Sequence, residues 1–425
     1  MKLKRYLLGE ELDFQRKIFF WNMLGSGVNA LATLVLQVVV TRLFGEVRAG
    51  IFLFAYPLAQ QLLTLGGYEM RPYQATDVKE TFPFGTYLAS RFVTGAAMML
   101  GAALFILLGG YTEQDACLIF LLCTYKLFDA LEDVFHGMFQ QRGRLDIAGR
   151  ALTLRVVLST SVLVITLLIN RNMLFSTLLA ICAAAVGLVL FNIPEAREFV
   201  KLRPSFSWPP LKKLLTVCFP LCAGTSMLQY ISTAPRLAIR SLLPEEMITY
   251  FGILFMPNFV INLFTGFAFK PLLTTMASSW VIGNRKKFRL IVFRGMLFVL
   301  GFTILTILVG TWLGLPVLSM LYHVKLDGYL PELLMLLLGG GFNAASVILY
   351  YAITVMRRQK SLVYIYAAAF LIALLGARPV VGHCGLMGAC VLYTALMAFI
   401  TLLFWGALLL FSYRNKYGKE KGGSR

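Results

Sequence analysis

The chain has 425 residues, of which 59% are hydrophobic and 14% are charged, and its formal net charge is +19. A soluble core of this length does not need so much apolar sequence, whereas a polytopic helical membrane protein does. The apolar runs are long and continuous, which excludes a membrane β-barrel built from short alternating strands. We therefore expect an all-α polytopic membrane protein.

The N-terminal segment, residues 1–17, is basic and amphipathic but lacks an apolar core followed by a small-residue cleavage site. We interpret it as a retained segment at the cytoplasmic membrane surface, not as a signal peptide. Twelve apolar segments follow, each close to the length of about 20 residues that spans the hydrocarbon. Their expected limits are 18–41, 49–67, 87–110, 116–139, 151–169, 174–192, 214–235, 246–269, 290–313, 329–355, 361–379 and 384–411.

A long, basic and Pro-containing segment, residues 193–213, divides these spans six and six. We expect an N-lobe at 18–192, a cytoplasmic linker at 193–213, a C-lobe at 214–411 and a basic cytoplasmic tail at 412–425. The halves show weak internal similarity, since GIFLFAYP (50–57) parallels GILFMPNF (252–259). Two repeats with an even number of spans share one orientation, which is typical of transporters that bind substrate between the halves.

The Lys and Arg residues are distributed unevenly between the two sides of the membrane. Of the 39, 28 lie on the side of the N-terminus, 7 on the other side and 4 within spans. This bias places both termini in the cytoplasm. The high net charge is therefore mostly a topology signal with some attraction to anionic membrane lipids, and it does not require a nucleic-acid partner.

The most polar span is 116–139, and its polar side chains share one helical face. Lys126, Asp129, Asp133 and His136 fall within an arc of about 80° at 100° per residue. Such a stripe would cost several kcal/mol in lipid, so it must face protein or a wet cavity. We name Asp129, Asp133, Glu132 and His136 as candidates for coupling to H+ or Na+. For His136, a packing role with a hydrogen bond to Glu132 is the alternative.

Cations in or near the spans are candidate ligands for an anionic substrate, because the planar guanidinium can donate two hydrogen bonds to phosphate oxygens. These candidates are Arg42, Arg91, Lys126, Arg155, Arg236 and Arg240. Structural alternatives exist for most of them. Arg91 and Arg155 could pair with carboxylates and join the helices of the first lobe. Arg236 and Arg240, four residues apart, could extend to the membrane interface, and Arg42 could be a turn residue.

The sequence shows no catalytic motif. It contains no nucleophile–base pair, carboxylate dyad or Walker-type loop. Gly339–Gly341 lacks the GK[ST] that a phosphate-binding loop needs, and is typical of close helix packing or a hinge. We therefore expect no enzymatic activity and no cofactor. The energy for transport would come from an ion gradient or from the gradient of the substrate itself.

Several stretches resemble the polysaccharide-flippase branch of the multidrug/oligosaccharidyl-lipid/polysaccharide exporter (MOP) superfamily. They are TRLFGEVRAGIF (41–52), GGYEMRPYQATDV (66–78), YLASRFVTG (87–95), FHGMFQQRGRLDIAGRALTLRVV (135–157), PRLAIR (235–240), FMPNFVINLF (255–264), FKPLLTTMA (269–277) and GLMGACVLY (385–393). The resemblance implies a V-shaped bundle of two six-helix lobes, as in MATE transporters. It also implies that the protein flips an undecaprenyl-diphosphate-linked oligosaccharide across the bacterial cytoplasmic membrane, and that other polysaccharide-assembly proteins are its partners.

Two rival functions belong to other classes. A multidrug cation antiporter of the same superfamily would need an acidic, aromatic cavity. Here the cations in or near spans outnumber Asp129, Glu132 and Asp133, which favours an anionic ligand. A membrane-embedded polymerase or ligase would need a large outer loop with catalytic residues, and the outer turns of this chain are short.

Overall fold

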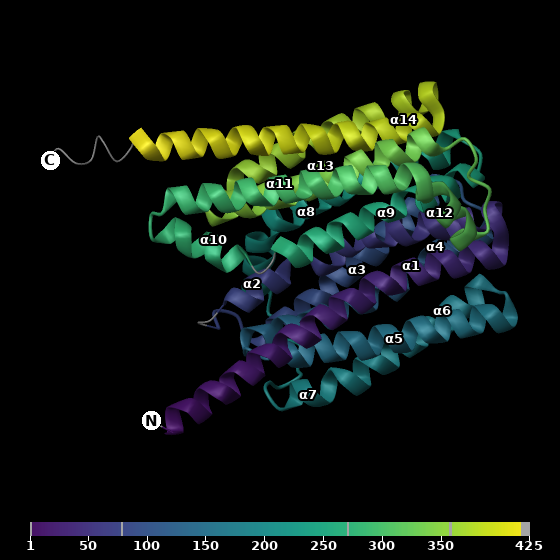
Figure 1. Cartoon of the computed structure of the whole chain (residues 1–425). Helices are drawn as coiled ribbons and strands as arrows, with labels where there is room; N and C mark the ends of the chain where they lie inside the picture. The colour runs from purple at the N-terminus through teal and green to yellow at the C-terminus, as the bar shows by residue number, and fades with distance from the viewer. Residues whose placement is uncertain (1, 78–79, 270–271, 357–358, 418–425) are drawn as a thin grey trace. The chain divides into compact units, whose positions relative to one another are not determined.

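The computed structural model describes residues 2–77, 80–269, 272–356 and 359–417, and within these ranges it contains helices and no strand (Figure 1). The helices are α1 (Lys2–Gly67), α2 (Met70–Thr76), α3 (Phe84–Gly109), α4 (Glu113–Gln141), α5 (Leu145–Asn170), α6 (Met173–Phe191), α7 (Ile193–Arg197), α8 (Trp208–Leu242), α9 (Glu246–Phe269), α10 (Leu272–Val281), α11 (Arg285–Val309), the π-helical turn η1 (Gly310–Gly314), α12 (Leu315–Tyr322), α13 (Leu330–Val355) and α14 (Gln359–Tyr417). The all-α prediction is confirmed.

Each of the twelve predicted spans falls on a helix, with ends that differ by a few residues. In two places a pair of consecutive spans is joined into one long helix. A glycine with positive φ then marks the break between the two spans. The break lies at Gly45 in α1 (φ 74°) and at Gly385 in α14 (φ 59°). Among the described residues, eight helices are long and apolar enough to cross a membrane. Helix α4 is not among them, because it carries a run of charged side chains in its middle.

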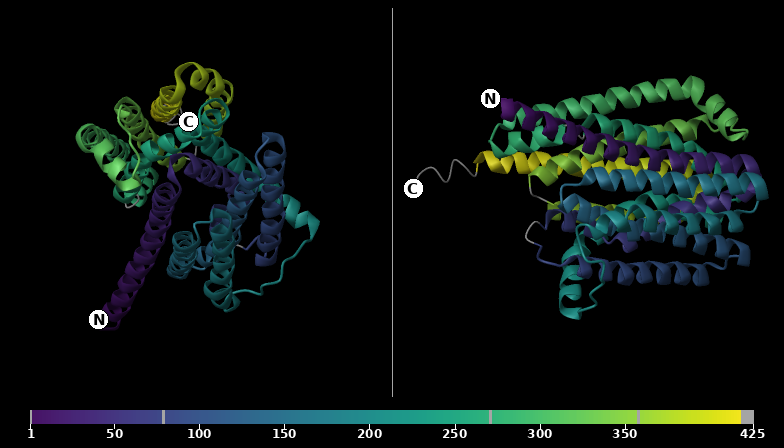
Figure 2. Two further views of the ribbon diagram at one scale, coloured as in Figure 1. Left: turned by 90° about the vertical axis from the view of Figure 1, so that its right-hand side faces the viewer. Right: turned by 90° about the horizontal axis from the view of Figure 1, so that it is seen from below.

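The chain divides into two compact units, Met1–Ser226 and Met227–Arg425. In the first unit α4 is the central helix, and it contacts α1, α2, α3, α5 and α6. Helices α5 and α6 run side by side in every view (Figure 2). The charged face of α4 is therefore enclosed by other helices of its own unit and not by lipid.

In the second unit α13 is central, packed against α9, α11 and α14. Its three consecutive glycines allow this packing, because a Cβ at each would collide with a different helix. At Gly339 it would meet Thr394 at 2.7 Å, at Gly341 Thr303 at 2.5 Å, and at Gly340 the side chain of Asn258. The close-packing interpretation of this sequence is confirmed.

The segment predicted as an inter-lobe linker, 193–213, lies within the first unit, and the division between units falls inside α8. The reason is that the linker packs onto α3 and α4. Phe199 makes an edge-to-face contact with Phe139 at 6.1 Å, and the Ser205 amide donates to the Gly85 carbonyl at 2.9 Å. The predicted N-terminal segment continues into α1 from Lys2, and residues 418–425 of the predicted tail lie outside the described residues.

Candidate functional site

Arg155 and the α4 carboxylates form a buried ion-pair network. The Arg155 guanidinium donates from Nε to Glu132 and from Nη2 to Asp129, each at 2.6 Å. Lys126 donates to the other Asp129 oxygen at 2.8 Å and lies 4.7 Å from the centre of the Tyr56 ring on α1. Spacings of three residues along α4 place Lys126, Asp129 and Glu132 on one side of the helix. Lys126 of this span and Arg155 of α5 therefore neutralise Asp129 and Glu132.

Arg91 on α3 forms a second ion-paired group, with Asp133. Its Nη2 donates to Asp133 at 2.7 Å, and its Nη1 donates to the carbonyls of Gly66 and Gly67 at the end of α1. Arg71 on α2 approaches the other Asp133 oxygen at 3.5 Å. A single buried guanidinium thus connects three helices. The structural alternative given above for Arg91 and Arg155 is confirmed as far as the pairing is concerned.

Glu132 has two further partners. The Asn192 side chain donates to its second oxygen at 3.0 Å, and His136 Nε2 lies 3.5 Å from the same oxygen. Both Glu132 and His136 are buried. His136 therefore lies where the four-residue spacing predicted it, beside Glu132.

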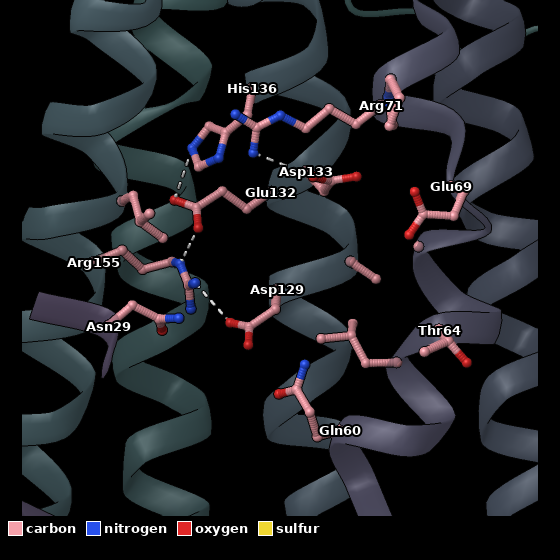
Figure 3. A pocket seen from close by; sticks show the side chains of 15 residues that line it. Asn29, Gln60, Thr64, Glu69, Arg71, Asp129, Glu132, Asp133, His136 and Arg155 are labelled. Carbon is pink, nitrogen blue, oxygen red and sulfur yellow. Dashed lines mark hydrogen bonds and ion pairs between the residues drawn. The ribbon is translucent and has the colours of Figure 1, made fainter. Parts of the chain in front are cut away.

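A cavity of about 420 Å³ lies beside these groups in the first unit. Figure 3 shows the acidic and basic side chains of α4 and α5 on one side of it and those of the α1–α2 connection on the other. Polar and charged residues dominate its lining, which comprises Asn29, Gln60, Thr64, Glu69, Arg71, Asp129, Glu132, Asp133, His136 and Arg155, together with Leu63, Gly67, Pro72, Ala130 and Leu152. Such a lining can hydrogen-bond a polar ligand inside the membrane.

Two charged lining residues, Glu69 and Arg71, are not among the candidates predicted from the sequence. Arg71 enters the sequence prediction only as one of the basic residues on the cytoplasmic side. The available signal was the Gly66–Gly67 pair, which ends α1 and turns the following residues back towards α4. Glu69 lies at this turn with φ 49°.

Adding Glu69 and Arg71, one residue of each sign, leaves the charge of this region balanced. The cations around the cavity are Arg71, Arg91, Lys126 and Arg155, and the carboxylates are Glu69, Asp129, Glu132 and Asp133. Four positive charges therefore face four negative ones around this cavity, and the excess of cations counted from the sequence comes from Arg236 and Arg240 in the second unit.

The remaining candidates lie elsewhere. Arg42 is exposed near the break in α1. Arg236 on α8 is buried in the second unit, where its guanidinium lies 4.5 Å from the centre of the Phe255 ring and 5.2 Å from that of Phe251. Arg240, one turn further, is ion-paired with Glu245 at 2.8 Å. The two arginines therefore share a helix but not an environment.

The charge of Arg236 is not balanced by a carboxylate in the described part of the chain. Its Nη1 donates to the Ser232 carbonyl at 3.0 Å, and its Nε has no hydrogen-bond partner among the described atoms. Within the same residues, no group of three or more His, Cys, Asp or Glu side chains is arranged to hold a metal ion.

No protein-family model and no curated protein matches this chain by sequence. Several solved structures match over nearly the whole length. The lipid II flippase MurJ in an inward-closed conformation is 12% identical, with 93% of this chain and 87% of that chain covered and a TM-score of 0.69. A point mutant of the Vibrio cholerae MATE transporter VcmN is 15% identical, with 95% of this chain and 98% of that chain covered and a TM-score of 0.61.

A third match is a MOP-superfamily transporter from Pyrococcus furiosus, whose binding pocket is described as having reversed polarity. It is 12% identical, with 94% of each chain covered and a TM-score of 0.55. The three structures are transporters and a flippase of one superfamily, and at these identities they establish the fold. The chain is an all-α, multi-pass membrane protein with the fold shared by MATE transporters and the flippase MurJ.

Proposed function

We propose that this chain is a flippase that moves an undecaprenyl-diphosphate-linked oligosaccharide from the cytoplasmic to the outer leaflet of a bacterial cytoplasmic membrane, with both termini cytoplasmic, for cell-surface polysaccharide synthesis. The physical task is to carry a diphosphate and sugars across about 30 Å of hydrocarbon. It requires hydrogen-bonding groups for the sugars and at least one cation for the phosphates.

Arg236 is the observation on which the proposal rests. A buried cation without a counter-ion is costly, and a bound anion would remove that cost. The guanidinium is held over two aromatic rings and offers the planar pair of donors that suits phosphate oxygens. The cavity of the first unit is a separate place for the same headgroup, because its lining includes Arg71 and Arg155 as well as amide and hydroxyl groups. The likeness to a lipid II flippase supports the same class of substrate.

Transport into vesicles tests the proposal. Full-length protein would be reconstituted with a fluorescent short-chain polyprenyl-diphosphate sugar, and the label reaching the opposite leaflet would be measured with an impermeant quencher. Arg236→Gln should lower the rate by tenfold or more, because one contact to a charged group contributes about 1.5–3 kcal/mol. Arg294→Gln, which changes an exposed arginine of the same unit, is the matched control. Equal rates for protein-containing and empty vesicles would refute the proposal.

One observation favours a second candidate, a cation-coupled multidrug antiporter. Glu69 lines the cavity and has no cation within ion-pairing distance among the described residues. An unpaired carboxylate in a cavity could bind a cationic drug. Uptake of ethidium driven by a proton or sodium gradient, lost in Glu69→Gln and unaffected by Arg236→Gln, would favour the antiporter over the flippase.

A further inference from the structure

Glu69 differs from the other seven charged side chains around the cavity, because each of those has an opposite charge close by. Asp133 is held by Arg91 at 2.7 Å, Asp129 by Arg155 at 2.6 Å, and Glu132 by Arg155 at 2.6 Å. A cation at such distances favours the ionised form of a carboxylate. Glu69 is therefore the acidic group of this cavity that can change its charge with the least loss of contacts.

The surroundings of Glu69 contain both signs of charge and a neutral hydrogen-bonding group. Asp133 on α4 opposes ionisation of Glu69, whereas Arg91 on α3 favours it. The Thr225 hydroxyl on α8 approaches the carboxyl group, and a hydroxyl can donate to a carboxylate or accept from a carboxylic acid. The other titratable groups nearby are Arg71 on α2 and the thiols of Cys218 and Cys222 on α8.

The backbone conformation that directs Glu69 into the cavity is energetically unfavourable. Tyr68 and Glu69 both adopt left-handed conformations with φ 49°, which are unfavourable for residues other than glycine. Figure 3 shows the Glu69 side chain pointing into the pocket from the side opposite Arg155. A conformation of this kind is typical of functional positions, where the surrounding structure maintains it.

The charge of the whole cavity depends on this group. With Glu69 ionised, four carboxylates balance four cations, and the cavity has no net attraction for an anion. With Glu69 protonated, the net charge becomes +1. We propose that Glu69 is a proton-binding site, and that an anionic headgroup and one proton occupy this cavity together. This inference rests on the proposed function, because it takes the headgroup to be a diphosphate.

Glu69 also lies close to the residue at which the first unit ends. Its neighbour Thr225 precedes Ser226, the last residue of the first unit. The Ser226 hydroxyl is 2.8 Å from that of Thr64, and the Ser226 carbonyl accepts from Gln61 at 3.1 Å. Helix α8 continues through this point into the second unit. Protonation of Glu69 would therefore change its contact with Thr225, within the first unit.

Calorimetry on the full-length protein in detergent tests the inference, with farnesyl diphosphate as the probe. Titrations at several values between about pH 5.5 and about pH 8, in buffers of different ionisation enthalpy, give both affinity and protons taken up. Where Glu69 is ionised in the free protein, wild-type affinity should fall about tenfold per pH unit, with about one proton bound per probe molecule. Glu69→Gln should lose this pH dependence and take up about one proton fewer than wild type, a difference in which titration of the probe's own phosphate cancels.

Two variants guard against indirect effects. Glu69→Asp should retain proton uptake, and Glu113→Gln, at an exposed carboxylate of α4, should behave as wild type. Wild-type proton uptake in Glu69→Gln would overturn the inference and leave the flippase proposal standing. No binding of the probe by wild type at any pH would instead overturn the flippase proposal. Binding of ethidium that competes with the proton and is lost in Glu69→Gln would overturn both in favour of the antiporter.

Discussion

Arg155 on α5 and Glu132 on α4 form an ion pair in which both side chains are 1% exposed and Nε lies 2.6 Å from the carboxylate oxygen. The Arg155 side chain fits here because Gly187 on α6 has no Cβ, which would lie 2.8 Å from the Arg155 Cγ. Three helices of the first unit therefore meet at one guanidinium. In this conformation the principal role of the Arg155 guanidinium is to neutralise Asp129 and Glu132. A substrate would have to compete with these carboxylates to bind Arg155.

Arg155→Ala should lower the free energy of unfolding by about 3–5 kcal/mol, because it leaves Glu132 buried without its cation. Arg155→Lys should also be destabilising, since one ammonium cannot replace the separate Nε and Nη2 contacts to two carboxylates. Thermal and denaturant unfolding of purified protein in detergent would measure both changes.

Two controls separate this effect from a general sensitivity to mutation. Arg48→Ala, at an exposed arginine, should change stability by no more than about 0.5 kcal/mol. Combining Arg155→Met with Glu132→Gln removes both charges and should recover most of the lost stability, because Asp129 keeps Lys126. If Arg155→Ala unfolds like wild type, the ion pair is not structural.

The fold was largely predictable because apolar length and charge bias are local properties of a membrane sequence. The spans, the α4 face and the packing role of Gly339–Gly341 all follow from residue spacing. The boundary between the units could not be predicted from residue spacing, because the 193–213 segment has the composition of a free linker. Its attachment depends on contacts such as that of Phe199 with Phe139, which are distant in sequence.

The candidate site was predictable only in part. Spacing placed the α4 carboxylates together and suggested arginine partners for them. It did not place Glu69 opposite Asp133, because the left-handed turn at Tyr68 and Glu69 reverses the chain without a glycine at either position. The charge count from the spans also missed Glu245, which pairs with Arg240, so that Arg236 is left as the buried cation without a carboxylate in the described part of the chain.

Gly149→Ala should separate α5 from α1 and cost about 1–3 kcal/mol, as overpacking does. A Cβ at this position would lie 2.5 Å from the Trp21 carbonyl and 2.8 Å from the Asn22 amide, and backbone atoms cannot move aside as a side chain can. Gly27→Ala, whose Cβ would meet nothing within 4 Å, should be neutral or slightly stabilising. Thermal unfolding of the two variants side by side measures the difference, and equal stability would contradict the close contact.

Asp77, in the connection after α2, should make stability depend on pH at the acidic end. Burial alone would raise the pKa of Asp77, but hydrogen bonds from the Thr81 and Phe82 amides and the Tyr87 hydroxyl outweigh it and lower this pKa. A lowered pKa in the folded state stabilises the protein above the unfolded pKa of about 4, and this contribution is lost as the pH falls through the folded value.

Asp77→Asn should therefore be less stable than wild type near neutral pH, by about 1–3 kcal/mol, and the difference should shrink below about pH 4. Denaturant unfolding at a series of pH values would follow it. Asp327→Asn, at an exposed loop position of the second unit, serves as the control and should show no such trend. A stability difference that grows on acidification would have the wrong sign for this interpretation.

Gly85→Ala should loosen the 193–213 segment from the first unit without unfolding the helices. A Cβ at Gly85 would lie 2.5 Å from the Arg203 carbonyl and would disturb the bond from the Ser205 amide to the Gly85 carbonyl. Limited trypsin digestion of the folded protein should then cut several-fold faster after the exposed Lys201, because a detached segment fits a protease more readily. Gly101→Ala, whose nearest contact would be an ordinary 3.6 Å, should digest as wild type does. Unchanged cleavage in Gly85→Ala would mean that other contacts, such as the Arg150–Glu195 ion pair, suffice to hold the segment.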